Sequence, residues 1–373
     1  MKCTEIIKYL ELWAPKEIAW ERDNVGLQVG SFERDIKNVM LCLDITPAVV
    51  NEAIKKSCNF IISHHPLLFH SLKKISLDED YRSKVIEQLI KNDITLYSAH
   101  TNLDFTKDGV SFRLAQKLKL QNIEFLKKLN SNQVKLTVFV PEESVEKVSD
   151  AIFKAGGGII GEYSHCSFRS HGNGTFKGSD KTKPAVGEKE KFESVNEIRL
   201  EILVDSWKIK KVLSELLKVH PYEEPAYDIY PLQNENIKYG EGAIGLLPEE
   251  MQADDFLNYI CESLNIPNLR FTNSYKDKIK KVAVCGGAGS DLIGEAKNSG
   301  ADVYITADIK YHTFQEAEGQ ILLIDAGHYE TEIFSLEEIQ ERLGSFLNKG
   351  IRVFKYSKST NPVKFYNNKK ENG

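Results

Sequence analysis

The chain has 373 residues, and its 54 aspartates and glutamates against 49 lysines and arginines give a net charge of −5 at pH 7. The 41% hydrophobic and 28% charged residues are typical of a globular protein and exclude global disorder, and the length predicts two to three domains. The negative charge argues against a main role in binding nucleic acid phosphates, and no apolar run reaches the roughly 18 residues of a membrane span.

The N-terminus and the cysteines indicate a cytoplasmic protein. Glu5 and Glu11 interrupt the stretch where a signal peptide would need a continuous apolar core. The six cysteines form no CxxC pair, and some, such as Cys42 and Cys285, lie in apolar runs. Buried free thiols are therefore expected rather than a disulfide framework.

The first 125 or so residues alternate helical and strand patterns. Thr46 and Pro47 are typical of an N-cap and a first-turn proline. Strands that alternate with helices predict parallel pairing in an α/β layer. The predicted elements are helices at 3–13, 46–57 and 81–92 and strands at 38–44, 59–63 and 94–99.

The middle of the chain has a different pattern. A strand and a helix precede a glycine-rich stretch at 156–178 and a polar loop at 179–194, and a strand, a helix and a strand come after them. This order predicts a small ferredoxin-like α+β module. The strands are expected at 134–141, 196–204 and 225–232.

After about residue 240 the alternation of strand and helix returns, which predicts one α/β domain interrupted by an inserted module. The predicted domain comprises residues 1–127 and 239–373, and the insert comprises residues 128–238. The expected elements are strands at 282–287, 302–308 and 321–327, a helix at 290–300 and a final amphipathic helix at 331–347.

Histidines and carboxylates follow the ends of three of these strands. Ligands of an open parallel sheet bind at the carboxyl ends of its strands, so these side chains are expected to meet in one crevice. Two of the histidines are each followed, four residues later, by a carboxylate. The residues are His64, His65, His100, Asp104, His328 and Glu332.

Their chemistry predicts a metal site. Imidazole and carboxylate are the usual ligands of zinc, iron and manganese, and five or six are too many for a single catalytic zinc. They suit two ions that share a bridging carboxylate, for which Glu332 is the candidate. A single histidine at a strand end is more often a cap, but burying this many polar groups without partners would cost about 1–3 kcal/mol each. Four other histidines, His70, His165, His171 and His220, are interpreted as surface or module residues.

Three further segments allow two interpretations each. Residues 285–291 (CGGAGSD) form either a tight turn with Ser290 as N-cap or an anion-binding loop, although the Lys-Ser/Thr of a P-loop is missing. Residues 23–30 (DNVGLQVG) favour a turn into an edge strand over a lining of the site by polar groups. Residues 220–232 (HPYEEPAYDIYPL) favour an edge strand over an intersubunit contact.

The motifs SHHPLLF, SAHTNLD, VAVCGGAGSDLI, ADVYITADIKYH and IDAGHYETE, with DNVGLQVG near the start, resemble the Nif-three-like family over nearly the whole chain. Its bacterial members are named GTP cyclohydrolase 1 type 2 homologs. The middle segment is similar to the insert of the long bacterial members. The resemblance implies a two-lobed α/β domain interrupted by a ferredoxin-like (CutA/PII-like) α+β domain.

The resemblance also implies two divalent metal ions per chain, zinc, iron or manganese, and a ring-shaped homohexamer built as a trimer of dimers. The ligands it implies are His64, His65, Asp104, His328 and Glu332, with His100 beside them. One departure is Ala307, where the family more often has glycine, which affects the local turn.

The function expected from the resemblance is metal-dependent hydrolysis, in which an activated water opens the imidazole ring of guanine in GTP. His100, if it is not a ligand, is the candidate proton shuttle because its ordinary pKa of about 6.5 suits proton transfer at neutral pH. The alternative is a non-enzymatic, metal-responsive regulatory or scaffold protein.

Overall fold

A computed structural model describes residues 1–273 and 276–365. The chain divides into two compact units, one made of Met1–Lys128 with Ile237–Gly373 and the other of Leu129–Asn236. None of the helices in the described ranges is both long and apolar enough to cross a membrane.

The first sheet of the larger unit has the strand order β1-β4-β3-β2-β15. Strands β2, β3, β4 and β15 run parallel, and β1 pairs antiparallel with β4 at one edge, as predicted for residues 23–30. The strands are β1 (Gly26–Val29), β2 (Asn38–Cys42), β3 (Phe60–Ser63), β4 (Thr95–Ser98) and β15 (Arg352–Lys355).

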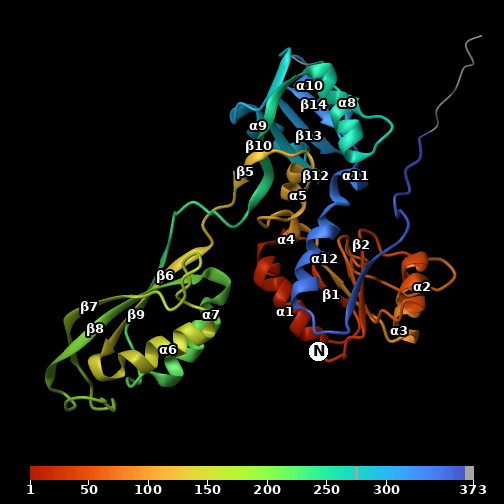
Figure 1. Cartoon of the computed structure of the whole chain (residues 1–373). Coiled ribbons are helices and arrows are strands. Elements are labelled where there is room, and N and C mark those ends of the chain that lie inside the picture. The colour runs from red at the N-terminus through yellow and green to blue at the C-terminus, as the bar shows by residue number, and fades with distance from the viewer. Residues whose placement is uncertain (274–275, 366–373) are drawn as a thin grey trace, which may run out of the picture. The chain divides into compact units, whose positions relative to one another are not determined.

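Helices cover both faces of this sheet, which explains why β3 and β4 are buried along their whole length. Helices α1 and α12 (Ser335–Phe346) pack on one face and α2 and α3 on the other (Figure 1). The predicted cap of α2 is confirmed, since the Thr46 hydroxyl accepts a hydrogen bond from the Val49 amide at 3.3 Å. The helices of this region are α1 (Cys3–Trp13), α2 (Pro47–Lys55), α3 (Tyr81–Lys91), α4 (Thr101–Asp104) and α5 (Val110–Lys117), with a 3-10 turn at Lys16–Ile18.

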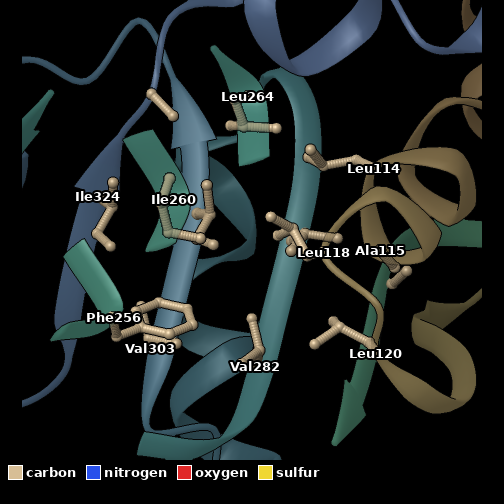
Figure 2. Close-up of a cluster of buried hydrophobic side chains, with 14 of the residues drawn as sticks. Leu114, Ala115, Leu118, Leu120, Phe256, Ile260, Leu264, Val282, Val303 and Ile324 are labelled. Carbon is tan, nitrogen blue, oxygen red and sulfur yellow. The ribbon is translucent and has the colours of Figure 1, made fainter. Parts of the chain in front are cut away.

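The second sheet of this unit has the order β11-β14-β13-β12-β10-β5, with β12, β13 and β14 parallel. Figure 2 shows side chains of α8, among them Phe256 and Ile260, beside strands β12 and β13, with α5 nearby. Helices α9 and α10 cover the opposite face. The strands are β5 (Gln121–Lys128), β10 (Gly240–Gln252), β11 (Arg270–Phe271), β12 (Lys278–Ala288), β13 (Val303–Ala307) and β14 (Leu322–Asp325), and the helices are α8 (Ala253–Leu264), α9 (Ile293–Asn298), α10 (Tyr311–Ala317), α11 (His328–Glu332) and α12 (Ser335–Phe346).

The smaller unit has the chain order β-α-β-β-α-β and one antiparallel sheet with the order β7-β8-β6-β9. Helices α6 and α7 lie side by side on one face and enclose an apolar core against β6 and β8 (Figure 1). Its elements are β6 (Gln133–Pro141), α6 (Val145–Ala155), β7 (Phe168–Lys177), β8 (Phe192–Asp205), α7 (Ile209–Val219) and β9 (Tyr227–Pro231), with 3-10 turns at Glu142–Ser144 and Ser206–Lys208.

Two local predictions are wrong. The predicted helix at 331–347 is two helices, α11 and α12, and α11 begins earlier, at His328. Ser290 is not an N-cap, because it opens a 3-10 turn, Ser290–Leu292, that comes after Gly289 without a side-chain cap. In addition, β7 forms within the glycine-rich stretch because ten-residue pairing with β8 outweighs the low strand propensity of glycine.

Candidate metal centre

The parallel strands of both sheets of the larger unit carry polar residues at their carboxyl ends. His64 and His65 follow β3 directly, and His100 follows β4 and precedes the short helix α4 that ends at Asp104. From the other sheet, β14 leads into α11, which begins at His328 and ends at Glu332. The structure brings all six predicted residues into one cluster.

Glu332 lies at the centre of this cluster and is 3% exposed. Its Oε1 lies 3.0 Å from Nε2 of His328 and 3.6 Å from Nε2 of His64, and its Oε2 lies 3.2 Å from Nε2 of His65. Nε2 of His65 and Nε2 of His328 are 3.3 Å apart. One carboxylate therefore contacts three imidazoles that come from two sheets.

Asp104 and His100 complete the cluster. Oδ1 of Asp104 lies 3.5 Å from Nε2 of His64. The His100 ring centroid lies 5.2 Å from that of His64 and 5.4 Å from that of His65. Two overlapping groups, His64 with His65 and His100, and His65 with His328 and Glu332, have potential ligand atoms within 4.8 Å of one another.

Each of the four imidazoles is held through its Nδ1. A hydrogen bond at Nδ1 fixes the tautomer and the ring orientation, and it leaves the Nε2 lone pair for a metal ion. In three of these histidines the partner of Nδ1 is a carboxylate, which fixes the orientation of the ring. The pairs are His64 with the Ala99 carbonyl (2.8 Å), His65 with Asp44 (2.9 Å), His100 with Asp23 (2.9 Å) and His328 with Asp308 (2.7 Å).

Without metal, the cluster retains protons. Burial disfavours a charged imidazole, but the neighbouring carboxylates outweigh it and raise the pKa of His65 to about 10 and that of His328 to about 9. The pKa of His64 is raised for the same reason. Burial alone would raise the pKa of Glu332, yet the three imidazoles hold it well below its usual range. At Asp104 burial outweighs the imidazoles, and its pKa is raised.

Three buried atoms of the cluster make no hydrogen bond: Nε2 of His64, Oδ1 of Asp104 and Oε2 of Glu332. Buried polar atoms normally have partners, so three such atoms within one cluster indicate that a further group belongs among them. Nitrogen and carboxylate oxygen are ligands suited to zinc, iron or manganese. The residues present therefore fit a metal centre.

The glycines at the carboxyl end of β12 form a wall of the cluster. A Cβ on Gly287 would lie 2.3 Å from Oε1 of Glu332, and the backbone here has φ = +65°. The amides of Gly286 and Gly287 already donate to the hydroxyls of Ser111 (3.3 Å) and Thr331 (2.9 Å). The backbone of these glycines can therefore lie close to Glu332. This role differs from the anion-binding loop that was one interpretation of the sequence.

The carboxylates behind the histidines are harder to recognise in the sequence. The motif around Asp23 favours a turn, yet its buried carboxylate also accepts hydrogen bonds from the amide and hydroxyl of Thr101. Asp44 and Asp308 are not among the predicted site residues, although each comes after the end of a parallel strand, the signal that identifies the histidines. Ala307 needs no special backbone, because the positive φ of this turn (+55°) belongs to Asp308.

The other histidines lie outside the cluster. His70, His165, His171 and His312 are exposed, and His220 is buried in the smaller unit.

Comparison with known proteins agrees with this architecture. Residues 1–362 match the family model described as Duf34/NIF3 (NGG1p interacting factor 3). The chain belongs to this family. A Bacillus subtilis member named "GTP cyclohydrolase 1 type 2 homolog" is 41% identical over 366 residues, 97% of this chain and 98% of the relative. A Halalkalibacterium halodurans protein of the same name is 40% identical over 92% of each chain.

Two solved structures share the fold of this chain. The crystal structure of a Bacillus cereus protein related to NIF3 superposes with a TM-score of 0.81 at 39% identity, covering 98% of this chain and 99% of the other. A Staphylococcus aureus protein superposes with a TM-score of 0.78 at 30% identity and the same coverage. The mixed α/β architecture with several sheets is therefore that of this family.

Proposed function

We propose that the protein is a dinuclear metal-dependent hydrolase, and that opening of the guanine imidazole ring of GTP is the reaction to test first. The observation that carries the proposal is the placement of Glu332, which contacts three imidazoles with its two oxygens while one oxygen makes no hydrogen bond. The name shared by the Bacillus subtilis and Halalkalibacterium halodurans relatives supports GTP as the first substrate.

Charge supports two ions rather than one. Two carboxylates lie among the candidate ligands and three lie behind histidines. When ionised they carry five negative charges, and two divalent ions supply four positive charges. The side chains of Asp44 and Asp308 are 39% and 58% exposed, so solvent offsets part of this charge. A single ion would still leave more uncompensated negative charge around the buried Glu332 than two ions would.

We assign the ligands to His64, His65, Asp104, His328 and Glu332, with Glu332 shared between the ions. Two divalent ions there would lower the pKa of a coordinated water from 15.7 to about 7 and polarise the bond to be broken. His100 is assigned to proton transfer. Its Nδ1 donates to Asp23, whose pKa is lowered to about 2 against the effect of burial by hydrogen bonds from His100 and Thr101. Asp23 thus stays ionised, and the second nitrogen of His100 is available to exchange a proton.

A cavity of about 610 Å³ adjoins the centre and includes His65 and His328 in its lining. This volume lies within the range of about 300–1,000 Å³ found for small-molecule sites. Arg270 lies on the wall and pairs with Asp325, which limits its freedom to bind a phosphate. The volume of this cavity is large enough for a nucleotide substrate.

The test combines metal analysis with a hydrolysis screen on the same anaerobically purified protein. Zinc- or manganese-saturated protein should hold about two ions per chain and open the GTP ring. Glu332→Ala should lose both ions more readily than Asp104→Ala, and the exposed Glu316→Ala is the control. One ion or fewer would refute the dinuclear site. Full loading without turnover on any nucleotide would support the metal-responsive regulator instead.

We further propose that the smaller unit is a CutA/PII-like ferredoxin-like domain and that the chain assembles as a homohexamer. The β-α-β-β-α-β order and the antiparallel strand order of this unit support the first part. Light scattering tests the second part: a particle of six chain masses is expected, and a monomer at micromolar concentration would refute it.

A further inference from the structure

The smaller unit contains a cavity of about 630 Å³ that the proposed hydrolase does not use. It lies on the sheet face opposite α6 and α7. Ile198 and Leu200 of β8 point into the core against these helices, and Glu197 and Arg199 alternate with them and line the cavity. Strand β7, residues 182–185 and residues 222–224 form the remaining walls.

Glu197 carries the main signal. Its side chain lies in the cavity wall, and the residue is only 9% exposed. None of the ion pairs found among the described residues includes Glu197, and the nearby Lys135 and Arg199 pair with Glu201 instead. A Cβ on Gly174 of β7 would lie 2.0 Å from Oε2 of Glu197, so only glycine leaves room for the carboxylate there. A buried carboxylate without a cation is costly unless something pairs with it.

Tyr222 adds a second polar group, which lies beside Glu197. Its hydroxyl oxygen is buried and makes no hydrogen bond of good geometry, and burial together with its interaction with the Glu197 carboxylate raises the pKa of Tyr222. The Tyr222 ring centroid lies 6.3 Å from that of Phe176, which also lines the cavity. A carboxylate beside two aromatic rings suits a positively charged group.

His220 fixes this arrangement. The amide of Tyr222 donates to Nδ1 of His220 at 3.1 Å, and Nε2 of His220 lies 3.1 Å from the Phe139 carbonyl. Both hydrogen bonds can form only when Nε2 carries the proton and Nδ1 does not. The neutral imidazole therefore ties the Tyr222 loop to strand β6, which gives the HPYE part of the segment at 220–232 a structural role.

A metal ion and the nearby basic side chains are less suitable partners for Glu197. Among residues 1–273 and 276–365, the groups suited to a metal ion lie in the metal centre and not at this cavity. Arg199 already pairs with Glu201 at 3.0 Å, and Lys183 is exposed at the rim. Glu223 and Glu224 add further negative charge to the wall.

We propose that this cavity binds a small organic cation, a compound with a primary ammonium or guanidinium group, which pairs with Glu197 and donates to the Tyr222 hydroxyl. The aromatic rings of Tyr222 and Phe176 cover its carbon chain. This is a second binding site, separate from the metal centre and from the proposed hydrolysis.

Isothermal titration calorimetry of the full chain tests the proposal with agmatine and putrescine, and 1,4-butanediol serves as the uncharged control. The wild type should bind at least one amine and not the diol. Glu197→Gln keeps the shape and removes the charge, so it should weaken binding at least about tenfold. Tyr222→Phe should weaken it a few-fold, and the exposed Glu162→Gln should leave it unchanged.

A lysine side chain of another protein carries the same ammonium group, so the peptide Ac-Gly-Lys-Gly-NH2 is titrated in parallel. Tighter binding of the peptide than of putrescine would assign the cation to a protein, and the reverse would assign it to a metabolite. The proposal is overturned if neither amine nor peptide binds up to about 10 mM, if the diol binds equally well, or if folded Glu197→Gln and Tyr222→Phe both bind like the wild type.

Discussion

The Gly287→Ala substitution tests whether the candidate metal centre requires the backbone of Gly287 to lie close to the Glu332 carboxylate. Gly287 lies at the end of β12, and a Cβ there would come within 2.3 Å of Oε1 of Glu332 and 3.3 Å of Nε2 of His328. The first distance is about 1 Å short of the 3.4 Å at which ordinary van der Waals contact begins. Glu332 must therefore move, because the backbone of Gly287 is held by its hydrogen bond to Thr331.

The substitution carries two separate costs. Alanine at φ = +65° costs about 1–2 kcal/mol in unfolding free energy, since left-handed backbone brings its Cβ close to a carbonyl oxygen. A carboxylate displaced by about 1 Å exceeds the tolerance of about 0.2 Å for metal–ligand distances. We expect metal affinity to fall at least 10- to 100-fold, the range found when a group that supports a ligand is changed.

Gly319→Ala is the matched control, because Gly319 has φ = +70° and nothing lies within 4 Å of the added Cβ. Urea unfolding in the presence of a chelator should show similar destabilisation of the two variants. Zinc competition with a fluorescent chelator should show reduced affinity only in Gly287→Ala. Equal zinc affinity in the two variants would refute the role assigned to Glu332 at the centre of the site.

Three further predictions address turnover, domain independence and pH. His100→Ala should keep both ions and lose about 100- to 10,000-fold in hydrolysis rate; loss of metal would make His100 a ligand, and unchanged turnover would remove it from the mechanism. Deletion of residues 128–238 should leave a folded, metal-binding protein, because every candidate ligand lies outside them; a soluble deletion variant that binds no metal would contradict this. Burial lowers the pKa of His220, so the unfolded state binds its proton more readily and the smaller unit should lose stability as pH falls below about 6.5, by at most about 1.4 kcal/mol per pH unit. Hydrogen exchange of β6 and β8 between pH 7 and 5 should show this loss in the wild type and not in His220→Gln, and a flat wild-type profile would be the contrary result.

The alternation of strands and helices was predictable because each buried parallel strand is a short apolar run between turn signals. The order of the strands within each sheet was harder to predict from the sequence. The long antiparallel strands β7 and β10 carry glycines and charged residues, and they form because a partner strand lies alongside them. Their stability depends on pairing between segments that are distant in the sequence, and local strand propensity contains no information about such pairing.

The candidate site was predictable for the same reason as the strands. Parallel strands place the residues after their carboxyl ends at one edge of a sheet, which accounts for the grouping of His64, His65 and His100. Their meeting with His328 depends on the packing of a second sheet, which strand patterns alone do not predict. The aspartates behind them were harder to identify, since a single carboxylate after a strand is a common turn residue. The sequence placed Gly287 in a tight turn or an anion-binding loop, but its role beside Glu332 could not be predicted, because that role is the absence of a side chain.

The two sheets of the larger unit contribute different residues to the candidate metal centre, so metal binding would depend on contact between them. His64, His65 and Asp104 come from one sheet, and His328 and Glu332 come from the other. Without metal, the contact between these groups depends on protonated imidazoles facing a buried carboxylate. The proposed metal ions would have to displace those protons, so their affinity would fall with pH and would depend on the contact between the two sheets. The proposed site cannot form on either sheet alone, because each sheet supplies only part of the proposed ligand set.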